Sequence, residues 1–309
     1  MVGENLRHFG GLPVADFRGE GTPLDFTRTC PRLRCDYDDE QDLRDLLTLL
    51  LDQPSLPSLT ALVFGLWLEN GESYDVSPQP VLDMLVAFKL RLPALKALFM
   101  GDIVSEENEI SWIKQGDYAG IWAAFPRLEE IIVRGGADLS LGTINHQSLR
   151  KLAIQTGGLD QMVVREALSA NAPIEHFELW LGDEGYGANT SVADFEALFA
   201  GHLFPRLHTL ALRNAQYTDA IASALVASPL IDRIKRLDLS KGTLTDAGAQ
   251  ALISSGKLGQ LEQIDISFHY VSPEMVSELS RHTPKLIADD PQTPDDWDGE
   301  THYYVAVSE

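Results

Sequence analysis

The sequence contains few cysteines, few basic residues and no long apolar run, and each shortage excludes some classes of protein. Its 309 residues include two cysteines, Cys30 and Cys35, too few for a disulfide framework or for both ligand pairs of a zinc site. We expect both to be buried free thiols in a reducing compartment. No apolar run reaches the roughly 18 residues of a membrane-spanning helix. Residues 1–8 lack the apolar region of a secretion signal, so the chain is expected to be cytoplasmic.

Basic residues are scarce relative to acidic ones. Asp and Glu number 46 against 24 Lys and Arg, which gives a formal net charge of -22. A field of this sign repels phosphate backbones and anionic lipid surfaces, so neither nucleic acid nor a membrane is an expected partner. Solubility alone would account for such a charge, whereas a basic partner is the more specific interpretation.

Catalytic signatures are also missing from the sequence. It has no G-x-S-x-G, no phosphate-binding P-loop, no H-E-x-x-H and no C-x-x-C motif, and its eight histidines are scattered. His176 and Glu178 share one strand face, but two such residues do not make a metal site. We therefore expect a protein that is not an enzyme and that holds neither a cofactor nor a metal.

What the sequence does contain is a repeat with a period of 27 residues. Three segments read L-x-x-L-x-L, with the alternation of a strand at their ends. They are residues 207–212, 234–239 and 261–266. Apolar residues at helical spacing follow each segment, and Thr218, Thr245 and Ser272 stand where helix N-caps are expected. Such a unit cannot bury both its apolar faces alone, so the copies must stack.

The same frame recurs less regularly towards the N-terminus. Eight repeats can be counted, starting at residues 59, 95, 128, 149, 174, 207, 234 and 261. The sequence thus predicts an α/β leucine-rich-repeat solenoid, or horseshoe, with a parallel concave sheet and convex helices. We expect the solenoid to span residues 59–286, after an N-terminal arm and capping strand and helix in residues 1–58. An acidic loop and a final capping strand over residues 302–308 should fill residues 287–309.

Residues 215–256 resemble the ribonuclease-inhibitor-like class of leucine-rich repeats, and residues 237–252 match its pattern closely, although Lys241 and Gly242 stand where that class usually has an asparagine. The whole chain is also similar to a bacterial family of cytoplasmic leucine-rich-repeat proteins, and its two ends, residues 8–17 and 303–309, carry that likeness. Both resemblances imply the solenoid fold. Neither implies an activity or a catalytic residue, because this fold serves many unrelated functions.

The concave face offers the first candidate binding surface. Alternate strand residues point away from the core, and the central one is Val63, Phe99 and Ile132 in three successive repeats. Exposed together, these side chains would form an apolar patch of the kind that marks a contact surface. The alternative is that the N-terminal arm, residues 8–30 with several apolar side chains, lies over this patch.

Long loops after the strands offer the second candidate surface. The repeats starting at 59, 95 and 174 exceed 27 residues, and their extra residues combine aromatic and acidic side chains. Insertions at one place in a repeat emerge on one face of a solenoid and often form its binding face. We expect Trp67 and Trp180 to form an apolar platform there. The neighbouring carboxylates are those of Asp102, Asp183 and Glu184.

Together these features predict a non-enzymatic protein–protein interaction scaffold. Exposed Trp and carboxylate side chains suit a basic, partly apolar protein or peptide, which they would hold by cation–π contacts and charge-assisted hydrogen bonds. The alternative is an enzyme, or a sensor of a small ligand or metal, with an unrecognised carboxylate site on the long-loop edge.

We predict that the chain does not bind duplex DNA at physiological salt, because its net charge of -22 repels the phosphate backbone. A fluorescence-anisotropy titration with a labelled duplex at about 150 mM salt should show no saturable binding up to roughly 100 µM protein. A micromolar dissociation constant would contradict this prediction.

Overall fold

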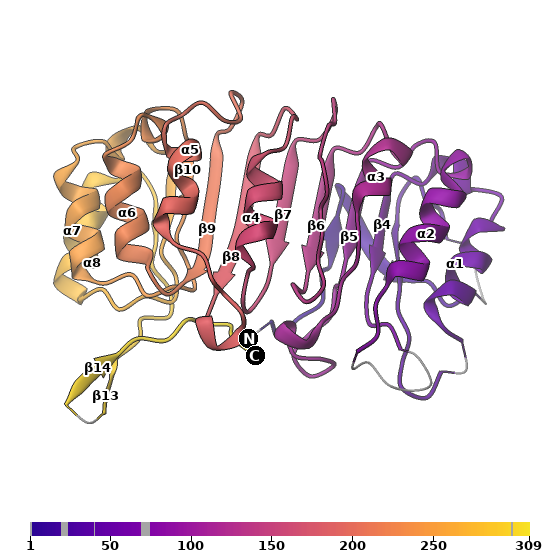
Figure 1. Cartoon of the computed structure of the whole chain (residues 1–309), viewed down its shortest axis with the longest axis horizontal. Coiled ribbons are helices and arrows are strands. Elements are labelled where there is room, and N and C mark those ends of the chain that lie inside the picture. The colour runs from indigo at the N-terminus through magenta and orange to yellow at the C-terminus, as the bar shows by residue number, and fades with distance from the viewer. Residues whose placement is uncertain (1, 20–23, 40, 69–74, 298) are drawn as a thin grey trace. The chain divides into compact units, whose positions relative to one another are not determined.

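Strands and helices alternate along the chain as the repeat predicts (Figure 1). The computed structural model describes residues 2–19, 24–39, 41–68, 75–297 and 299–309. The chain divides into two compact units. The first unit comprises Met1–Gln155, Ser169–Ala172 and Glu309, and the second Thr156–Leu168 and Pro173–Ser308. In each unit the helices cover one face of the strands (Figure 1).

The strands of the first unit follow one another in chain order. They are β1 (His8–Phe9), β2 (Leu12–Asp16), β3 (Cys30–Leu33), β4 (Ala61–Phe64), β5 (Ala97–Met100), β6 (Glu130–Arg134) and β7 (Lys151–Gln155). Its helices are α1 (Leu43–Leu51), α2 (Gln79–Ala87) and α3 (Ala119–Ala124). Neighbouring strands pair in parallel, except that β1 is antiparallel to β2.

The second unit has the same alternation. Its strands are β8 (His176–Gly182), β9 (Thr209–Ala215), β10 (Arg236–Asp238), β11 (Gln263–Asp265) and β12 (Leu286–Ile287), all parallel. Its helices are α4 (Gln161–Leu168), α5 (Glu196–Phe199), α6 (Thr218–Val226), α7 (Asp246–Ser254) and α8 (Pro273–His282). A separate antiparallel hairpin consists of β13 (Asp295–Trp297) and β14 (Glu300–His302).

The pairing register places equivalent repeat positions side by side. Leu237 pairs with Leu210 on one side and with Ile264 on the other, one 27-residue repeat away in each direction. Equivalent residues also pair in the first unit, where the repeats differ in length. There the third residues of the frame are Ala61, Ala97, Glu130 and Lys151. The predicted repeat frame and the parallel sheet are therefore confirmed.

Two of the three predicted helix caps are present. Thr245 and Ser272 each accept a hydrogen bond from an amide in the first turn, at 3.2 and 3.3 Å. Thr218 is instead the buried first residue of α6. Its hydroxyl donates to the Ala215 carbonyl oxygen at 2.8 Å and accepts from the Thr243 amide at 3.1 Å. The cap prediction is wrong there because this hydroxyl joins the exit loops of two successive strands.

The N-terminal region contains the expected strand and helix, β3 and α1. The Asp42 side chain caps α1 by accepting from the amides of Arg44 and Asp45 at 2.8 and 3.0 Å. The preceding arm is less irregular than expected, because β1 and β2 form a hairpin and β2 pairs with β3.

The prediction that residues 302–308 form the final strand of the sheet is wrong, because β12 already occupies the position beside β11. Residues 303–308 instead cross the ends of earlier strands. The Ala306 amide donates to the Lys241 carbonyl oxygen at 2.9 Å, and the Val307 amide donates to the Asn214 side chain at 3.0 Å. The alternation that suggests a strand reflects the burial of Val307 and its neighbour Val305 against these loops.

We predict that Leu237→Ala lowers the free energy of unfolding by about 2–5 kcal/mol, because it leaves a cavity in the core. The neighbouring Arg236→Ala should cost less than about 1 kcal/mol, since that side chain is exposed and its ion pair with Glu262 is a surface one. Urea unfolding followed by circular dichroism measures both. Equal losses would mean that the strand register is wrong.

Candidate functional site

The predicted apolar patch on the concave face of the first unit is covered. Val63, Phe99 and Ile132 lie side by side in β4, β5 and β6, but none is more than 6% exposed. Phe9 packs on Phe99 with the ring centroids 6.0 Å apart. Further residues packed on this cluster are Leu6, Leu12 and Val14. Residues 5–16, which we call the N-terminal cover, therefore bury the patch, and it is not an accessible binding surface.

Gly10 shows how closely the N-terminal cover approaches the sheet. Its φ of +56° lies in the left-handed region that favours glycine. A Cβ atom at this position would stand 2.6 Å from the Cβ of Ala61 and 3.1 Å from that of Ala97. The small side chains of β4 and β5 on this face thus make room for the turn between β1 and β2.

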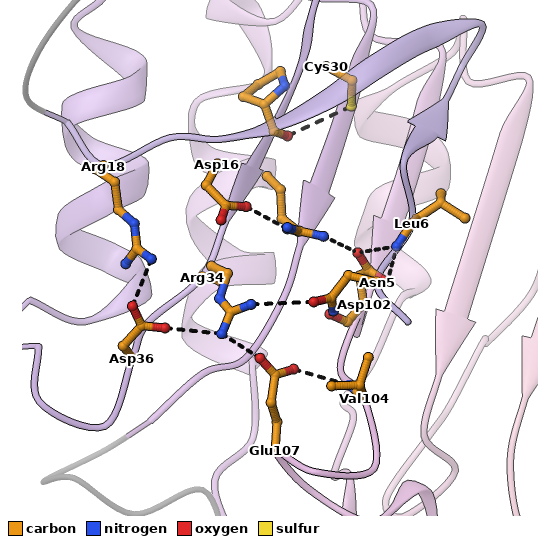
Figure 2. A network of polar contacts seen from close by, with 12 residues as sticks. Asn5, Leu6, Asp16, Arg18, Cys30, Arg34, Asp36, Asp102, Val104 and Glu107 are labelled. Atoms are coloured by element: carbon orange, nitrogen blue, oxygen red, sulfur yellow. Dashed lines mark hydrogen bonds and ion pairs between the residues drawn. The ribbon is translucent and has the colours of Figure 1, made fainter. Parts of the chain in front are cut away.

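Asp102 anchors the N-terminal cover (Figure 2). Its buried carboxylate accepts hydrogen bonds from the Leu6 amide, at 3.1 Å to each oxygen, and from Arg32 at 2.9 Å. The Arg134 guanidinium lies 3.6 Å away, and Asn5 donates to the Asp102 carbonyl oxygen at 2.9 Å. A buried carboxylate requires such partners. Contrary to the prediction, Asp102 therefore holds the cover in place and is not exposed on a loop.

A second group of ion pairs connects two exit loops of the first unit (Figure 2). Arg34, just after β3, pairs with Asp36 at 3.0 Å and also with Glu107 in the loop after β5. Asp36 pairs in addition with Arg18 at 2.7 Å. These contacts tie the loop after β3 to the long loop after β5.

Two exposed aromatic side chains stand on these connected loops. Tyr37 is 50% and Trp112 57% exposed, and the Tyr37 hydroxyl donates to the Glu107 carbonyl oxygen at 2.6 Å. Exposed carboxylates on the same loops are those of Asp38, Glu106 and Glu109. Within the part of the chain that the structure describes, these three have no ion-pair partner. We call Tyr37, Trp112 and the three carboxylates the exit-edge platform.

Trp67 does not belong to this platform. Its side chain is buried, and its indole N–H donates to the Val76 carbonyl oxygen at 3.0 Å. It lines a cavity of about 60 Å³ together with Asp42 and Val81. The remainder of the predicted loop, residues 69–74, lies outside the described residues. The expectation of an exposed Trp67 is wrong because the indole packs inside the first unit.

Trp180 is likewise buried, in the second unit. Its indole N–H donates to Glu178 at 2.8 Å. The Arg213 guanidinium carbon lies 5.0 Å and the Lys241 ammonium 5.3 Å from its ring centroid. Two cations of this chain thus already make cation–π contacts with the Trp180 ring. The expectation that Trp180 offers a free platform is wrong for that reason.

Glu178 lies at the centre of this cluster. Burial alone would raise its pKa, but a hydrogen bond from His176 at 3.2 Å, the Arg213 charge at 3.4 Å and the Trp180 bond lower the pKa to about 2. The carboxylate is therefore ionised at neutral pH. Arg213 also meets Asp238 at 3.4 Å, so charges of both signs compensate one another within the cluster.

Asp183 and Glu184 are the two predicted residues that remain accessible. Asp183 is partly exposed and accepts a hydrogen bond from the Gly185 amide at 2.7 Å, which caps a short turn. Glu184 and Tyr186 are exposed on that turn. The exit loop of β8 thus carries the expected acidic and aromatic chemistry, with Tyr186 rather than Trp180 as its exposed ring.

The cysteines show no sign of reactivity. Both are free and buried, as expected, and burial raises the pKa of each thiol to about 12. Neither is a thiolate at neutral pH. Among the described residues, no group of three or more His, Cys, Asp or Glu side chains could hold a metal. No helix within the described ranges is long and apolar enough to cross a membrane.

The sequence does not single out Tyr37 or Trp112 as binding residues. Trp112 ends the long insertion after β5, so the insertion itself could have identified it. Tyr37 follows the capping strand β3 and carries no repeat signal. Its place in the platform becomes evident only from the contacts of Arg34 and Glu107, which connect the two loops.

A solved bacterial structure shares this fold. The crystal structure of a Bacteroides fragilis protein matches at 30% sequence identity with a TM-score of 0.79, over 90% of this chain and 76% of that chain. An internalin of Listeria monocytogenes matches over 84% of this chain and 67% of that chain, at 11% identity and a TM-score of 0.35, which is too low to support a conclusion. No protein-family model matches the sequence. No curated protein matches it.

We predict that Trp180→Ala destabilises the second unit. Loss of the buried ring, its hydrogen bond to Glu178 and its two cation contacts should lower the free energy of unfolding by about 3–5 kcal/mol. The matched control Tyr186→Ala removes an exposed ring from the same exit loop and should cost less than about 1 kcal/mol. Thermal and urea melts would distinguish them, and equally small losses would show that Trp180 is not part of the packed interior.

Proposed function

This chain belongs to the same family as the Bacteroides fragilis protein and is a leucine-rich-repeat protein, and we propose that it is a non-enzymatic scaffold that binds a basic protein or peptide segment. The observation that carries the proposal is the exit-edge platform. There, Tyr37 and Trp112 are exposed on two connected loops, which also carry exposed carboxylates that have no ion-pair partner in the described chain.

The state of the concave face favours the loops as the binding surface. The N-terminal cover fills the apolar side of β4 to β6, and the Asp102 ion pairs hold it there. A partner entering that face would have to remove the cover and leave Asp102 buried without its amide donor, which is costly. The exit-edge platform, in contrast, is accessible without any rearrangement of the first unit.

The chemistry of the platform suits an arginine or lysine side chain. A guanidinium group can stack on an indole ring and donate to a neighbouring carboxylate at the same time. The Tyr37 ring is held by its hydroxyl, and the loop that carries Trp112 is held by the Arg34 ion pairs. Such prior ordering reduces the entropy lost on binding.

The overall charge supports the same class of partner. A net charge of -22 attracts a basic segment over a distance of about a Debye length, which is roughly 8 Å at physiological salt. Association should therefore become slower as salt is added. Asp183, Glu184 and Tyr186 present similar chemistry on the β8 exit loop, and we propose them as a further contact point in the second unit.

The alternative assignment is an enzyme, or a sensor of a small ligand or metal, with a carboxylate site on these loops. Such a site would need convergent groups around one reacting atom or ion. The three platform carboxylates lie on the surface of two loops, and no observation on the described residues favours that alternative.

We predict that a labelled peptide of alternating arginine and serine binds the chain and that Trp112→Ala weakens this binding at least about tenfold, as for an interface hot spot. Replacing Glu106 and Glu109 by Lys should slow association and reduce its salt dependence. Fluorescence anisotropy and stopped-flow mixing would measure the two effects.

A matched control is Met162→Ala, which removes an apolar side chain that is 58% exposed on α4 in the second unit. It should leave the affinity unchanged. The proposal fails if Trp112→Ala and Met162→Ala have the same effect, or if a peptide of alternating glutamate and serine binds equally well.

A further inference from the structure

An apolar groove lies where the chain enters β5 and β6. It has a volume of about 350 Å³ and is lined by Lys89, Leu90, Leu92, Pro93 and Leu95 and by residues 123–127. Leu90 on its rim is 88% exposed, and Phe88 beside it is also exposed. Large apolar side chains gathered at an apolar groove are typical of a contact surface.

Leu90 is not needed by the repeat. At several strand entries a buried apolar residue closes the turn three positions before the first Leu of the frame. In this repeat that residue is Leu92, whose carbonyl oxygen accepts from the Leu95 amide at 3.2 Å. The same contact joins Leu56 and Leu59 at 2.9 Å. A polar side chain in place of Leu90 would leave this turn intact, so the fold does not account for an exposed leucine there.

Cations surround the groove. Lys89 and Arg127 are exposed, and neither has a carboxylate partner among the described residues. Arg91 meets Asp52 at 3.5 Å, with both side chains in solvent. In a chain with 46 acidic and 24 basic residues, this local excess of positive charge favours an acidic segment that also carries an apolar side chain.

The chain itself carries such a segment, the hairpin of β13 and β14. Its two strands pair with each other and with no other described strand, and Figure 1 shows it standing away from the other strands and helices of its unit. Asp295, Asp296 and Glu300 are exposed on it, and Tyr304 is exposed just after it. A lone two-stranded hairpin is marginally stable in water, so a surface that packs on it would stabilise it.

We infer that the groove of one copy binds the β13–β14 hairpin of a second copy. The carboxylates of Asp295 and Glu300, which the pairing register places on the same face of the hairpin, pair with Lys89 and Arg127, and Tyr304 supplies the apolar contact with Leu90. Each copy has one groove and one hairpin, so the contact is head-to-tail and produces a ring or an open chain of copies. The net charge of -22 on every copy opposes this growth and limits it to high protein concentration.

Sedimentation velocity of the full chain tests this inference. Between about 1 and about 300 µM in about 150 mM salt, we expect the weight-average mass to rise at least about 1.5-fold. Leu90→Asp should abolish the rise. The matched control Met162→Asp places the same charge on a residue that is 58% exposed on α4, and should leave the rise intact.

A charge exchange identifies the two surfaces. Lys89→Glu with Arg127→Glu should abolish association, and so should Asp295→Lys with Glu300→Lys, while all four changes in one chain should restore it. Thermal melts confirm that each variant is folded. A constant monomer mass, association that survives Leu90→Asp, or a fourfold variant that associates no better than either double variant would each overturn the inference.

Trp112→Ala should leave this association unchanged, because the exit-edge platform is not part of the contact. Conversely, Leu90→Asp should still bind the peptide of alternating arginine and serine. A failure of self-association is thereby distinguishable from a failure of the proposed peptide-binding function.

Discussion

The strands of the first unit carry apolar side chains on both faces, and the remainder of that unit follows from the need to bury both. Helices cover one face, and the N-terminal cover buries Val63, Phe99 and Ile132 on the other. Each buried aliphatic or aromatic side chain contributes roughly 1.5–3 kcal/mol, enough in sum to hold a short hairpin on the sheet. The buried Asp102 accepts from the Leu6 amide at the start of the cover, and Arg32, whose side chain is 12% exposed, donates to Asp102.

The second unit has the same repeat frame, but the side chains on the inner face of its sheet are mostly polar. Its concave side chains include Glu178, Arg213 and Asp238, which compensate one another by ion pairs and hydrogen bonds. A polar face of this kind needs no apolar cover. The C-terminal segment runs past the ends of these strands, where the Tyr304 carbonyl oxygen accepts from the Tyr270 hydroxyl and the Val307 amide donates to the Asn214 side chain. One sequence pattern thus supports two different inner surfaces.

The fold could be predicted from the sequence because the period relates residues that touch. Leu210, Leu237 and Ile264 are one repeat apart and pair directly. The binding residues could not be predicted in the same way, because strand alternation gives the direction of a side chain but not what lies over it. Trp180 is buried by cations from later repeats, and Phe99 by a hairpin from the N-terminus.

Hydrogen–deuterium exchange of the full chain, with and without the arginine-containing peptide, tests the central claim that a basic partner binds at the strand exits while the concave face stays closed. The account predicts slower exchange in residues 36–39 and 102–112 and no change in residues 6–16. Faster exchange in residues 6–16 together with protection of β4 to β6 would show that the partner displaces the N-terminal cover, and would contradict the account.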